Sequence, residues 1–445
     1  MIHLGIDMGT TAVKAVVTDK DLQVIKTWDC SYPTFYDGDK ATQNIQDIIT
    51  IVDDIIAQAK SEFTVNDMAL SCAMHSVILL NDSLKVISDL LIWSDSRAKD
   101  VVDEFLKRDD ALDIYQRTGT AIHPMNPFMK LMWFKKQGQL NADVRVGDLK
   151  SVVFHHLTGV FAVDKGIASA TGLYNTDTMS YDEKILNILE LSEDALPRVE
   201  DGRYKLSLQN DASIEVYLGG SDGGLANIYF DPEYTGNGVC NAGTSGAYRR
   251  IAQVKPRTSK QDVFNYIIDD NAWIVGYASN NCGNVLDWML AGIAQDYTLS
   301  ECIDIYKERS ESDRPFFLPF VYAERGKDWN YHKTQKFVGL LEHHTLEDKI
   351  ASIVEGVLFN LASLADISEE NEVINITGGL FKEPFFRQIY ADCTQRKLRY
   401  ITEDFASALG VIAYVKKYTQ RSNESIDIYP QKSNKRFLKF LEISA

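Results

Sequence analysis

Apolar and polar positions alternate at the start of the chain. Apolar residues occupy every second position in 2–6 and again in 13–17, with a short polar turn between the two runs. A period of two is typical of half-buried strands, so this pattern predicts two β-strands joined by a tight turn. Residues 44–59 then show apolar side chains three and four positions apart, which predicts an amphipathic helix. The short apolar run 68–74, ending at His75, predicts a buried strand.

Strand and helix patterns continue to alternate along the rest of the chain. Further strands are predicted at 214–218, 239–242, 247–254 and 374–377. Helical spacing predicts helices around 98–107, 128–137, 149–157, 285–294, 346–366 and 384–396. Alternation of this kind indicates an α/β fold. The basic residues of the tail, 432–439, predict a solvent-exposed helix face.

The second half of the chain repeats the opening pattern. Gly9-Thr10-Thr11 and Gly243-Thr244-Ser245 each lie between two predicted strands. Two related halves that face each other would bring both turns to one central cleft. Asp231-Pro232 punctuates the chain near the middle. We therefore expect two domains, residues 1–229 and 230–445.

Composition restricts the class of protein. The 445 residues include 46 Lys+Arg and 63 Asp+Glu, a net charge of −17, which argues against a general nucleic-acid-binding surface. The six cysteines are isolated from one another, as expected in a reducing cytoplasm. The N-terminus has no signal-peptide pattern, and no apolar run reaches 18 residues, so we expect a cytoplasmic protein without a membrane partner.

The turn at 9–11 is the first candidate for chemistry. A glycine and two hydroxyl residues between strands offer backbone N–H groups and hydroxyls to a phosphate. Asp7 before the turn is placed to hold Mg²⁺ through water, and Lys14 adds a positive charge. The alternative, a plain hairpin with threonine caps, stays open.

The second candidate is the glycine-rich segment 219–224, which contains Asp222. Glycines on both sides leave this carboxylate accessible at the end of a predicted strand, where an Asp can accept a proton from a substrate hydroxyl. The segment is equally consistent with an Asp that caps a helix. At Thr377-Gly378-Gly379 the backbone could accept a flat ring, although a simple strand-to-helix turn is the stronger interpretation from these residues alone.

Three further segments are rich in polar groups, at 73–76, 93–97 and 123–125. Each histidine in them, taken singly, is more typical of a structural residue than of a ligand. The sequence contains no P-loop, no dinucleotide-binding glycine motif, no nucleophile elbow and no His-Glu-x-x-His spacing. These absences argue against the corresponding NTPases, dehydrogenases, hydrolases and zinc enzymes.

The ordered set of motifs resembles the FGGY family of carbohydrate kinases, over roughly 1–415. The segments that carry this likeness are Gly5-Ile-Asp7-Met-Gly9-Thr10-Thr11, Ala73-Met74-His75, Trp93-Ser-Asp95-Ser-Arg97, Gly220-Ser-Asp222-Gly, Gly243-Thr244-Ser245-Gly246 and Thr377-Gly378-Gly379. The resemblance implies two actin/hexokinase-like (ribonuclease H-like) domains around a central cleft. It also implies ATP and Mg²⁺ as cofactors and a small sugar or sugar acid as substrate, and it allows for a homodimer.

The resemblance also implies roles for individual residues. Asp222 would be the catalytic base, and Asp7 would hold the hydrated metal. The expected substrate-binding residues are Met74, His75, Ser76, Asp95, Arg97, His123 and Asp222. The expected nucleotide-binding residues are Gly9, Thr10, Thr11, Lys14, Gly243, Thr244, Ser245, Gly283, Gly378 and Gly379.

Within the family, the segments 71–78, 115–125, 168–172 and 221–227 are most similar to gluconate kinases. The expected reaction is therefore phosphorylation of D-gluconate to 6-phospho-D-gluconate, with xylulose or another ketose as the alternative substrate. A non-catalytic actin-like nucleotide-binding protein is a third hypothesis. Departures from the family pattern lie at Cys282-Gly283, where a glycine pair is common, and at Glu324-Arg325, which lacks the usual flanking Gly and Pro. The stretch 288–324 is also short for the family.

Overall fold

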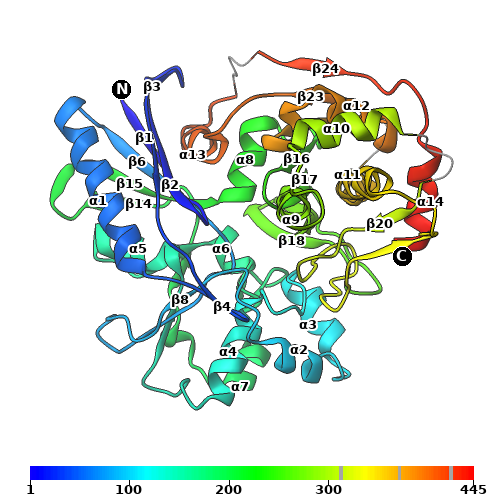
Figure 1. Cartoon of the computed structure of the whole chain (residues 1–445). Helices are drawn as coiled ribbons and strands as arrows, with labels where there is room; N and C mark the ends of the chain where they lie inside the picture. Colours follow the sequence, from blue (N-terminus) through cyan, green and yellow to red (C-terminus); the bar gives the residue numbers. More distant parts are fainter. Residues whose placement is uncertain (310–313, 369–371, 420–423, 445) are drawn as a thin grey trace. The chain divides into compact units, whose positions relative to one another are not determined.

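The computed structural model describes residues 1–309, 314–368, 372–419 and 424–444 (Figure 1). The chain divides into two compact units. The first comprises Met1–Thr235, Ile251–Val275 and Phe405–Gln420, and the second comprises Gly236–Arg250, Gly276–Asp404 and Arg421–Ala445. We keep 1–229 and 230–445 as the proposed domain ranges. The first compact unit also includes two stretches from later in the chain, Ile251–Val275 and Phe405–Gln420.

A six-stranded sheet forms the centre of the first unit, in the order β14-β15-β6-β1-β2-β3. The predicted opening strands are β1 and β2, which pair antiparallel, and β6 and β15 run parallel to β1 and β6 respectively. The predicted strand 68–74 ends earlier, at Cys72, although Ala73 N still donates to Met8 O at 2.9 Å. The bounds are β1 His3–Met8, β2 Ala12–Thr18, β3 Val24–Ser31, β6 Asp67–Cys72, β14 Lys205–Leu208 and β15 Asp211–Ser221.

Helices cover both faces of this sheet (Figure 1). On one face lie α1, Ile45–Glu62, and α5, Leu149–Thr158, both predicted from their apolar spacing. On the other face lie α8, Asp222–Phe230, and α13, Ala406–Lys416. Asn44 begins α1, since its side chain accepts a hydrogen bond from Gln46 N, as a helix N-cap does.

Two glycines allow α13 to pack unusually closely. A Cβ atom on Gly5 of β1 would lie 2.2 Å from Ala408 O, and one on Gly410 would lie 2.0 Å from Leu225 O of α8. A side chain at either position would push α13 away from its neighbour, so both contacts require glycine. Our sequence analysis did not predict α13, although it completes the first unit.

The remaining elements of the first unit surround the ends of the sheet. Its other helices are α2 Lys99–Phe105, α3 Ala111–Thr118, α4 Pro127–Lys136, α6 Lys165–Ser169, α7 Glu183–Leu189 and η1 Glu193–Ala195. Short strands are β4 Phe35–Asp37, β5 Lys40–Gln43, β7 Ile78–Leu80, β8 Leu90–Leu91, β9 Arg145–Gly147, β10 Ala162–Asp164, β11 Tyr174–Asn175, β12 Ser180–Tyr181 and β13 Arg198–Glu200. Strand β18, Phe264–Asp269, packs against α6.

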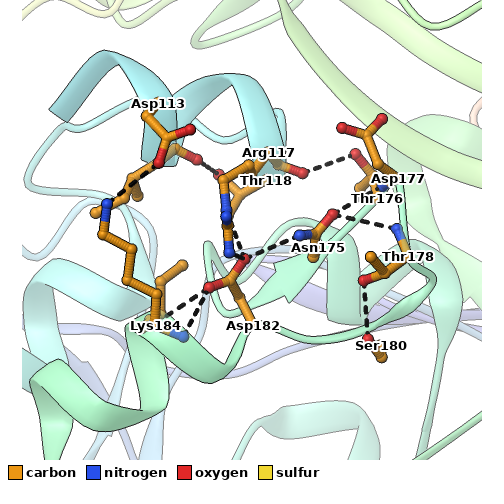
Figure 2. Close-up of polar contacts among 12 residues, drawn as sticks. Asp113, Arg117, Thr118, Asn175, Thr176, Asp177, Thr178, Ser180, Asp182 and Lys184 are labelled. Carbon is orange, nitrogen blue, oxygen red and sulfur yellow. Dashed lines mark hydrogen bonds and ion pairs between the residues drawn. The ribbon is translucent and has the colours of Figure 1, made fainter. Parts of the chain in front are cut away.

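Asp182 joins α3 to α7 within this region (Figure 2). Its Oδ2 accepts hydrogen bonds from Arg117 Nε at 2.9 Å and from Asn175 Nδ2 at 3.0 Å. Its Oδ1 accepts from Lys184 N at 3.0 Å and so caps α7. Arg117 also lines a surface hollow of about 570 Å³. Because Arg117 is committed to Asp182 in this way, we interpret the cluster as structural.

The sheet of the second unit repeats the arrangement of the first. Its strands β17-β16-β22-β23-β24 correspond in order and direction to β2-β1-β6-β15-β14. In both runs the first pair and the last pair are antiparallel and the middle pairs are parallel. The predicted internal repeat is therefore confirmed. The bounds are β16 Gly238–Ala242, β17 Gly246–Ala252, β19 Ala272–Ser279, β20 Phe316–Leu318, β21 Lys336–Val338, β22 Val373–Thr377, β23 Lys397–Tyr400 and β24 Ile426–Ile428.

A long buried helix, α11, Leu346–Ser363, forms the core of the second unit. Together with the turn that follows, the helical segment Leu346–Ile367 is long and apolar enough to cross a membrane. However, 83% of its 18-residue apolar stretch is buried inside the protein. We therefore interpret it as a core helix. The other helices of this unit are α9 Gly283–Gly292, α10 Leu299–Glu308, η2 Leu364–Ile367, η3 Gly379–Lys382, α12 Pro384–Thr394 and α14 Lys435–Ser444.

The C-terminal helix α14 corrects one expectation. We predicted a solvent-exposed basic face, and Lys432, Lys435 and Lys439 are exposed. Arg436, however, donates to both carboxylate oxygens of Glu355 of α11 at 3.1 Å through Nε and to Oε2 at 2.7 Å through Nη2. Arg314 binds the same carboxylate at 2.5 Å. Phe437 and Phe440 pack against Phe359. The prediction holds for the three lysines and was wrong for Arg436, whose charge is offset by a buried carboxylate on another helix.

Candidate active site

Asp7 lies near the end of β1, opposite Ser71 in the neighbouring parallel strand. Ser71 Oγ donates a hydrogen bond to Asp7 Oδ1 at 2.6 Å. Burial raises the pKa of Asp7 to about 7, and the negative charge of Asp222 adds to this, against the opposing effects of Ser71, Lys14 and Lys150. Two carboxylates that repel each other in this way would be stabilised by a cation, so the donor set fits a hydrated divalent metal ion.

Asp222 is the first residue of α8, directly after β15 ends at Ser221. Ser221 makes the N-cap, since its Oγ accepts a hydrogen bond from Gly224 N at 3.3 Å. The alternative in which Asp222 itself is the helix cap is therefore wrong. Asp222 Oδ1 accepts from Gly223 N at 2.7 Å, and the residue is half-buried. This places a carboxylate at a strand end in the first turn of a helix, where the helix dipole favours its charged form.

A bulge just before Asp222 is held by a buried lysine. The register of β15 against β6 shifts between Tyr217 and Gly220. Lys150 Nζ donates to the carbonyl oxygens of Leu70, Leu218 and Gly220, at 2.7, 2.7 and 3.1 Å. A bulge leaves ladder groups unpaired, and this ammonium satisfies three of the carbonyls around it. Sequence analysis missed Lys150, a charged residue among the mostly apolar buried residues of α5.

The turn at 9–11 is fixed by side chains from three other segments. Gly9 N donates to Ala12 O at 3.1 Å, and Tyr32 OH donates to Gly9 O. Thr10 accepts two hydrogen bonds, from Gln43 Nε2 to its carbonyl at 2.6 Å and from Trp93 Nε1 to its hydroxyl at 2.9 Å. These contacts hold the turn in one conformation. Lys14 lies beyond it, 3.6 Å from Asp29.

His75 sits in a turn directly after β6, with a positive φ of 67°. Its Nδ1 lies 2.8 Å from Ala170 O, and its ring packs against Tyr266 at 5.5 Å between centroids. A carbonyl can only accept, so Nδ1 carries a proton, and in the neutral form of the ring Nε2 is an acceptor. On either side, Met74 lines a small enclosed cavity with Gly9 and Trp93, and Ser76 Oγ accepts from Leu149 N.

His123 has the opposite hydrogen-bonding character. Its Nδ1 accepts a hydrogen bond from Met125 N at 3.1 Å, so in this arrangement the proton lies on Nε2. The side chain is 4% exposed. A neutral imidazole with this tautomer is suited to donate to an oxygen, whereas His75 is suited to accept from a hydroxyl.

Arg97 and Asp95 form a closed pair. Arg97 Nη2 lies 2.8 Å from Asp95 Oδ2 and its Nε donates to both oxygens, while Ala41 N donates to the same carboxylate at 2.9 Å. The Arg97 guanidinium also lies over the ring of Trp133, 4.5 Å from the centroid. Asp95 thus neutralises most of the charge that Arg97 could offer to an anionic substrate.

In the second unit the predicted nucleotide residues gather at one end of the sheet. Gly283 N at the start of α9 donates to Gly243 O at 3.0 Å, and Asn284 N donates to Thr244 O at 3.2 Å. Gly378 has φ 102°, and a Cβ atom there would lie 2.5 Å from Ala242 O. Two segments therefore pack closely against the turn 243–245, and each does so at a glycine, Gly283 in one and Gly378 in the other. Gly379 has open space around its Cα.

Glu324, whose flanking residues depart from the family pattern, is a buried centre of hydrogen bonds. Its carboxylate accepts from Ser279 Oγ at 2.7 Å, Asn281 Nδ2 at 2.9 Å and Asn280 N at 3.2 Å. These residues lead directly into α9. Glu324 therefore fixes the segment that supports the 243–245 turn, a role that sequence analysis did not predict.

Replacing Gly283 by alanine should displace this turn. The added Cβ would lie 2.6 Å from Gly243 O, and backbone atoms at that distance have to shift. We expect the free energy of unfolding to fall by about 1–3 kcal/mol, as overpacking usually causes. If this turn binds ATP, as the family resemblance implies, KM for ATP should rise about tenfold, measured by ADP release at saturating sugar.

Gly292→Ala is the matched control for Gly283→Ala. Gly292 ends the same helix, and a Cβ there would meet nothing within 4 Å. Alanine favours a helix by up to about 1 kcal/mol over glycine, so this variant should be as stable as the parent or more so. An unchanged KM for ATP in Gly283→Ala would show that this contact does not shape the nucleotide site.

Comparison with known proteins agrees with this geometry. The model of the FGGY family N-terminal domain matches residues 2–216, and that of its C-terminal domain matches residues 238–414. The chain belongs to the FGGY family of carbohydrate kinases and is a sugar kinase with the two-domain α/β fold of that family. In the part of the chain that the structure describes, no group of three His, Cys, Asp or Glu side chains could hold a metal ion.

The similar curated proteins include gluconokinases and xylulose kinases. A gluconokinase of Bacillus subtilis (strain 168) is 30% identical, over 92% of this chain and 85% of its own length. A gluconokinase of Bacillus licheniformis is 28% identical, over 96% of this chain and 89% of its own length. A xylulose kinase of Staphylococcus xylosus is 23% identical, over 92% of this chain and 89% of its own length.

Solved structures show the same fold. A crystal structure of gluconate kinase from Lactobacillus acidophilus matches with a TM-score of 0.90 and 25% identity, over all of this chain and 96% of that one. A structure described as ligand-bound xylulose kinase from the same organism matches with the same TM-score, identity and coverage. The structural likeness therefore does not distinguish the two substrates.

Proposed function

We propose that this sugar kinase transfers the γ-phosphoryl group of ATP to D-gluconate, giving 6-phospho-D-gluconate. The observation that carries this proposal is the identity of 28–30% to two gluconokinases over most of the chain. The xylulose kinases that we compared are 21–24% identical over similar lengths.

In this proposal Asp222 is the general base. Its carboxylate accepts the proton of the substrate's terminal hydroxyl as that oxygen attacks the γ-phosphorus, and ADP leaves with the bridging oxygen. The support is its place at the end of β15 in the first turn of α8, with Ser221 making the cap. The Lys150-held bulge fixes the backbone from which this side chain projects.

Each unit carries one of the two related turns, and each turn would contribute its own phosphate-binding groups. Gly9, Thr10, Thr11 and Lys14 would face the phosphates from the first unit, and Asp7 would hold the hydrated Mg²⁺. Mg²⁺, when bound, neutralises charge on the transferring phosphoryl group. The corresponding nucleotide residues of the second unit are Gly243, Thr244, Ser245, Gly283, Gly378 and Gly379.

The sugar acid would be held by the segments around His75, Asp95 and His123. His75 would accept a hydrogen bond from a substrate hydroxyl, and Met74 and Ser76 would flank it. Asp95 and Arg97 would contact hydroxyls as a pair. We assign the substrate carboxylate to the Nε2–H of His123, because Arg97 is already paired with Asp95.

Xylulose is the second candidate substrate, because the structure described as xylulose kinase matches this chain as well as that of gluconate kinase.

We propose a cytoplasmic enzyme, since none of the six cysteines is in a disulfide.

The substrate proposal is tested by ADP release with gluconate, xylulose, ribulose and glycerol at equal concentration. We expect kcat/KM for gluconate to exceed the others by at least about tenfold, since a polar site rejects analogues that leave its groups unpaired. A higher kcat/KM for xylulose than for gluconate would overturn the assignment of gluconate. ATP-dependent filaments without sugar-dependent ADP release would instead favour an actin-like role.

A further inference from the structure

Helix α4, Pro127–Lys136, contacts all three segments that we assign to the sugar. Asn126, its N-cap, holds the His123 segment by donating from Nδ2 to Ala121 O at 2.9 Å. Trp133 lies under the guanidinium of Arg97. Between these two positions lies Lys130, whose side chain faces the interior instead of solvent.

Lys130 is fully buried, with 0% of its surface exposed. Its Nζ donates to His75 O at 2.9 Å and to Ile92 O at 2.5 Å. The first carbonyl belongs to the Met74-His75-Ser76 segment, and the second immediately precedes the segment 93–97. The two loops lie 17 positions apart in the sequence and already share one backbone bridge, at which Val77 and Leu91 exchange two hydrogen bonds of 2.9 Å. Beyond that bridge, at His75 and Ile92, the ammonium group of Lys130 joins them.

The chemistry of Lys130 agrees with a hydrogen-bonding role. Burial lowers the pKa of Lys130 to about 7; Asp95 opposes this effect and Arg97 adds to it. Both the ammonium and the neutral amine have the two N–H donors that the two carbonyls require. The contact therefore survives deprotonation, and an apolar side chain of similar length removes it entirely.

Burying an amine costs more free energy than burying an apolar side chain of the same length. A long side chain without a polar end would pack into an apolar interior at lower cost, because burying an ammonium requires compensation by hydrogen bonds. Compared with such a residue, Lys130 additionally fixes the distance between the carbonyl groups of His75 and Ile92. Together with Trp133 under Arg97, it gives both loops a common support.

We propose that Lys130 is a positioning residue for sugar binding, which sets the His75 segment and the Asp95–Arg97 pair at a fixed spacing. This inference rests on the proposed function for the identity of the sugar-binding segments. It does not depend on which sugar is bound. In this role Lys130 does not touch the substrate, because its side chain is buried behind the two loops.

The test is Lys130→Met, which keeps the length of the side chain and removes the donors. KM should rise about tenfold or more for the sugar that the wild-type enzyme phosphorylates best, with KM for ATP changing less than about twofold. Lys135→Met is the matched control. Lys135 lies on the same helix, donates to Ile188 O at 2.8 Å, and is far more exposed than Lys130. Both KM values should stay unchanged in the control.

A second measurement separates this inference from the choice of substrate. Hydrogen exchange of the backbone amides should accelerate at 74–77 and 93–97 in Lys130→Met, and not in Lys135→Met. Unchanged exchange in both segments would overturn the proposal, whatever the sugar. So would equal increases in KM for sugar and for ATP, since a merely structural residue would affect both. If gluconate is not a substrate but these effects appear with another sugar, the substrate assignment fails and the role of Lys130 stands.

Discussion

Replacing Asp222 by asparagine should lower kcat by about 10²- to 10⁴-fold, the range that a general base contributes. Asparagine has the same shape as aspartate but cannot accept the proton of the attacking hydroxyl. Ser221 would still cap α8, so the helix should form normally. The measurement is the rate of sugar-dependent ADP release at saturating ATP and sugar.

The fold must be shown to be intact for this result to count. Asp222 is half-buried, and the substitution removes its repulsion with Asp7. We therefore expect the free energy of unfolding in Asp222→Asn to be equal to or slightly higher than in the parent protein. Near wild-type kcat in a folded Asp222→Asn protein would eliminate Asp222 as the base.

Replacing Lys150 by methionine should reduce the free energy of unfolding by about 3–5 kcal/mol, the usual effect of removing one partner of a buried ion pair. The carboxylate of Asp164 lies 3.4 Å from Lys150 Nζ, and both side chains are almost completely buried. Methionine would also leave the carbonyls of Leu70, Leu218 and Gly220 without this donor. Urea unfolding followed by circular dichroism measures the change.

Lys60→Met is the control for this stability effect. Lys60 forms an ion pair with Asp211 at 2.7 Å on the surface, where both side chains are about one-third exposed. An exposed pair contributes about 0–1 kcal/mol, so the control should remain near the parent stability. A loss of less than about 1 kcal/mol in Lys150→Met would show that the bulge does not depend on this ammonium.

Sequence analysis predicted the elements whose pattern is local. Strands β1 and β2 alternate with a period of two, α1 has a clear apolar stripe, and the repeated Gly-Thr turns indicated the related sheets. It missed α13, because the run 406–415 is apolar on all sides and gives no amphipathic period. Such a helix is recognisable only once its neighbours on every side are known.

The candidate site shows the same difference between features that depend on local sequence and features that depend on distant contacts. Asp7 and Asp222 were proposed from the sequence because carboxylates beside glycine turns are a feature of short segments. Lys130 and Lys150 were missed because a lysine on a helix is normally solvent-exposed. Their burial depends on carbonyls that belong to strands and loops distant in the sequence, which no local pattern records.

The close packing of α13 on β1 has a consequence for the order of synthesis. Ala408 of α13, which lies against Gly5 of β1, is synthesised 403 positions after it in the sequence (408 − 5). The part of the first sheet around Gly5 therefore stays uncovered until α13 has been made, although α8 on the same face is made much earlier. Exposed apolar surface on a nascent chain is a target for chaperones, so we expect chaperones to raise the folding yield of this kinase.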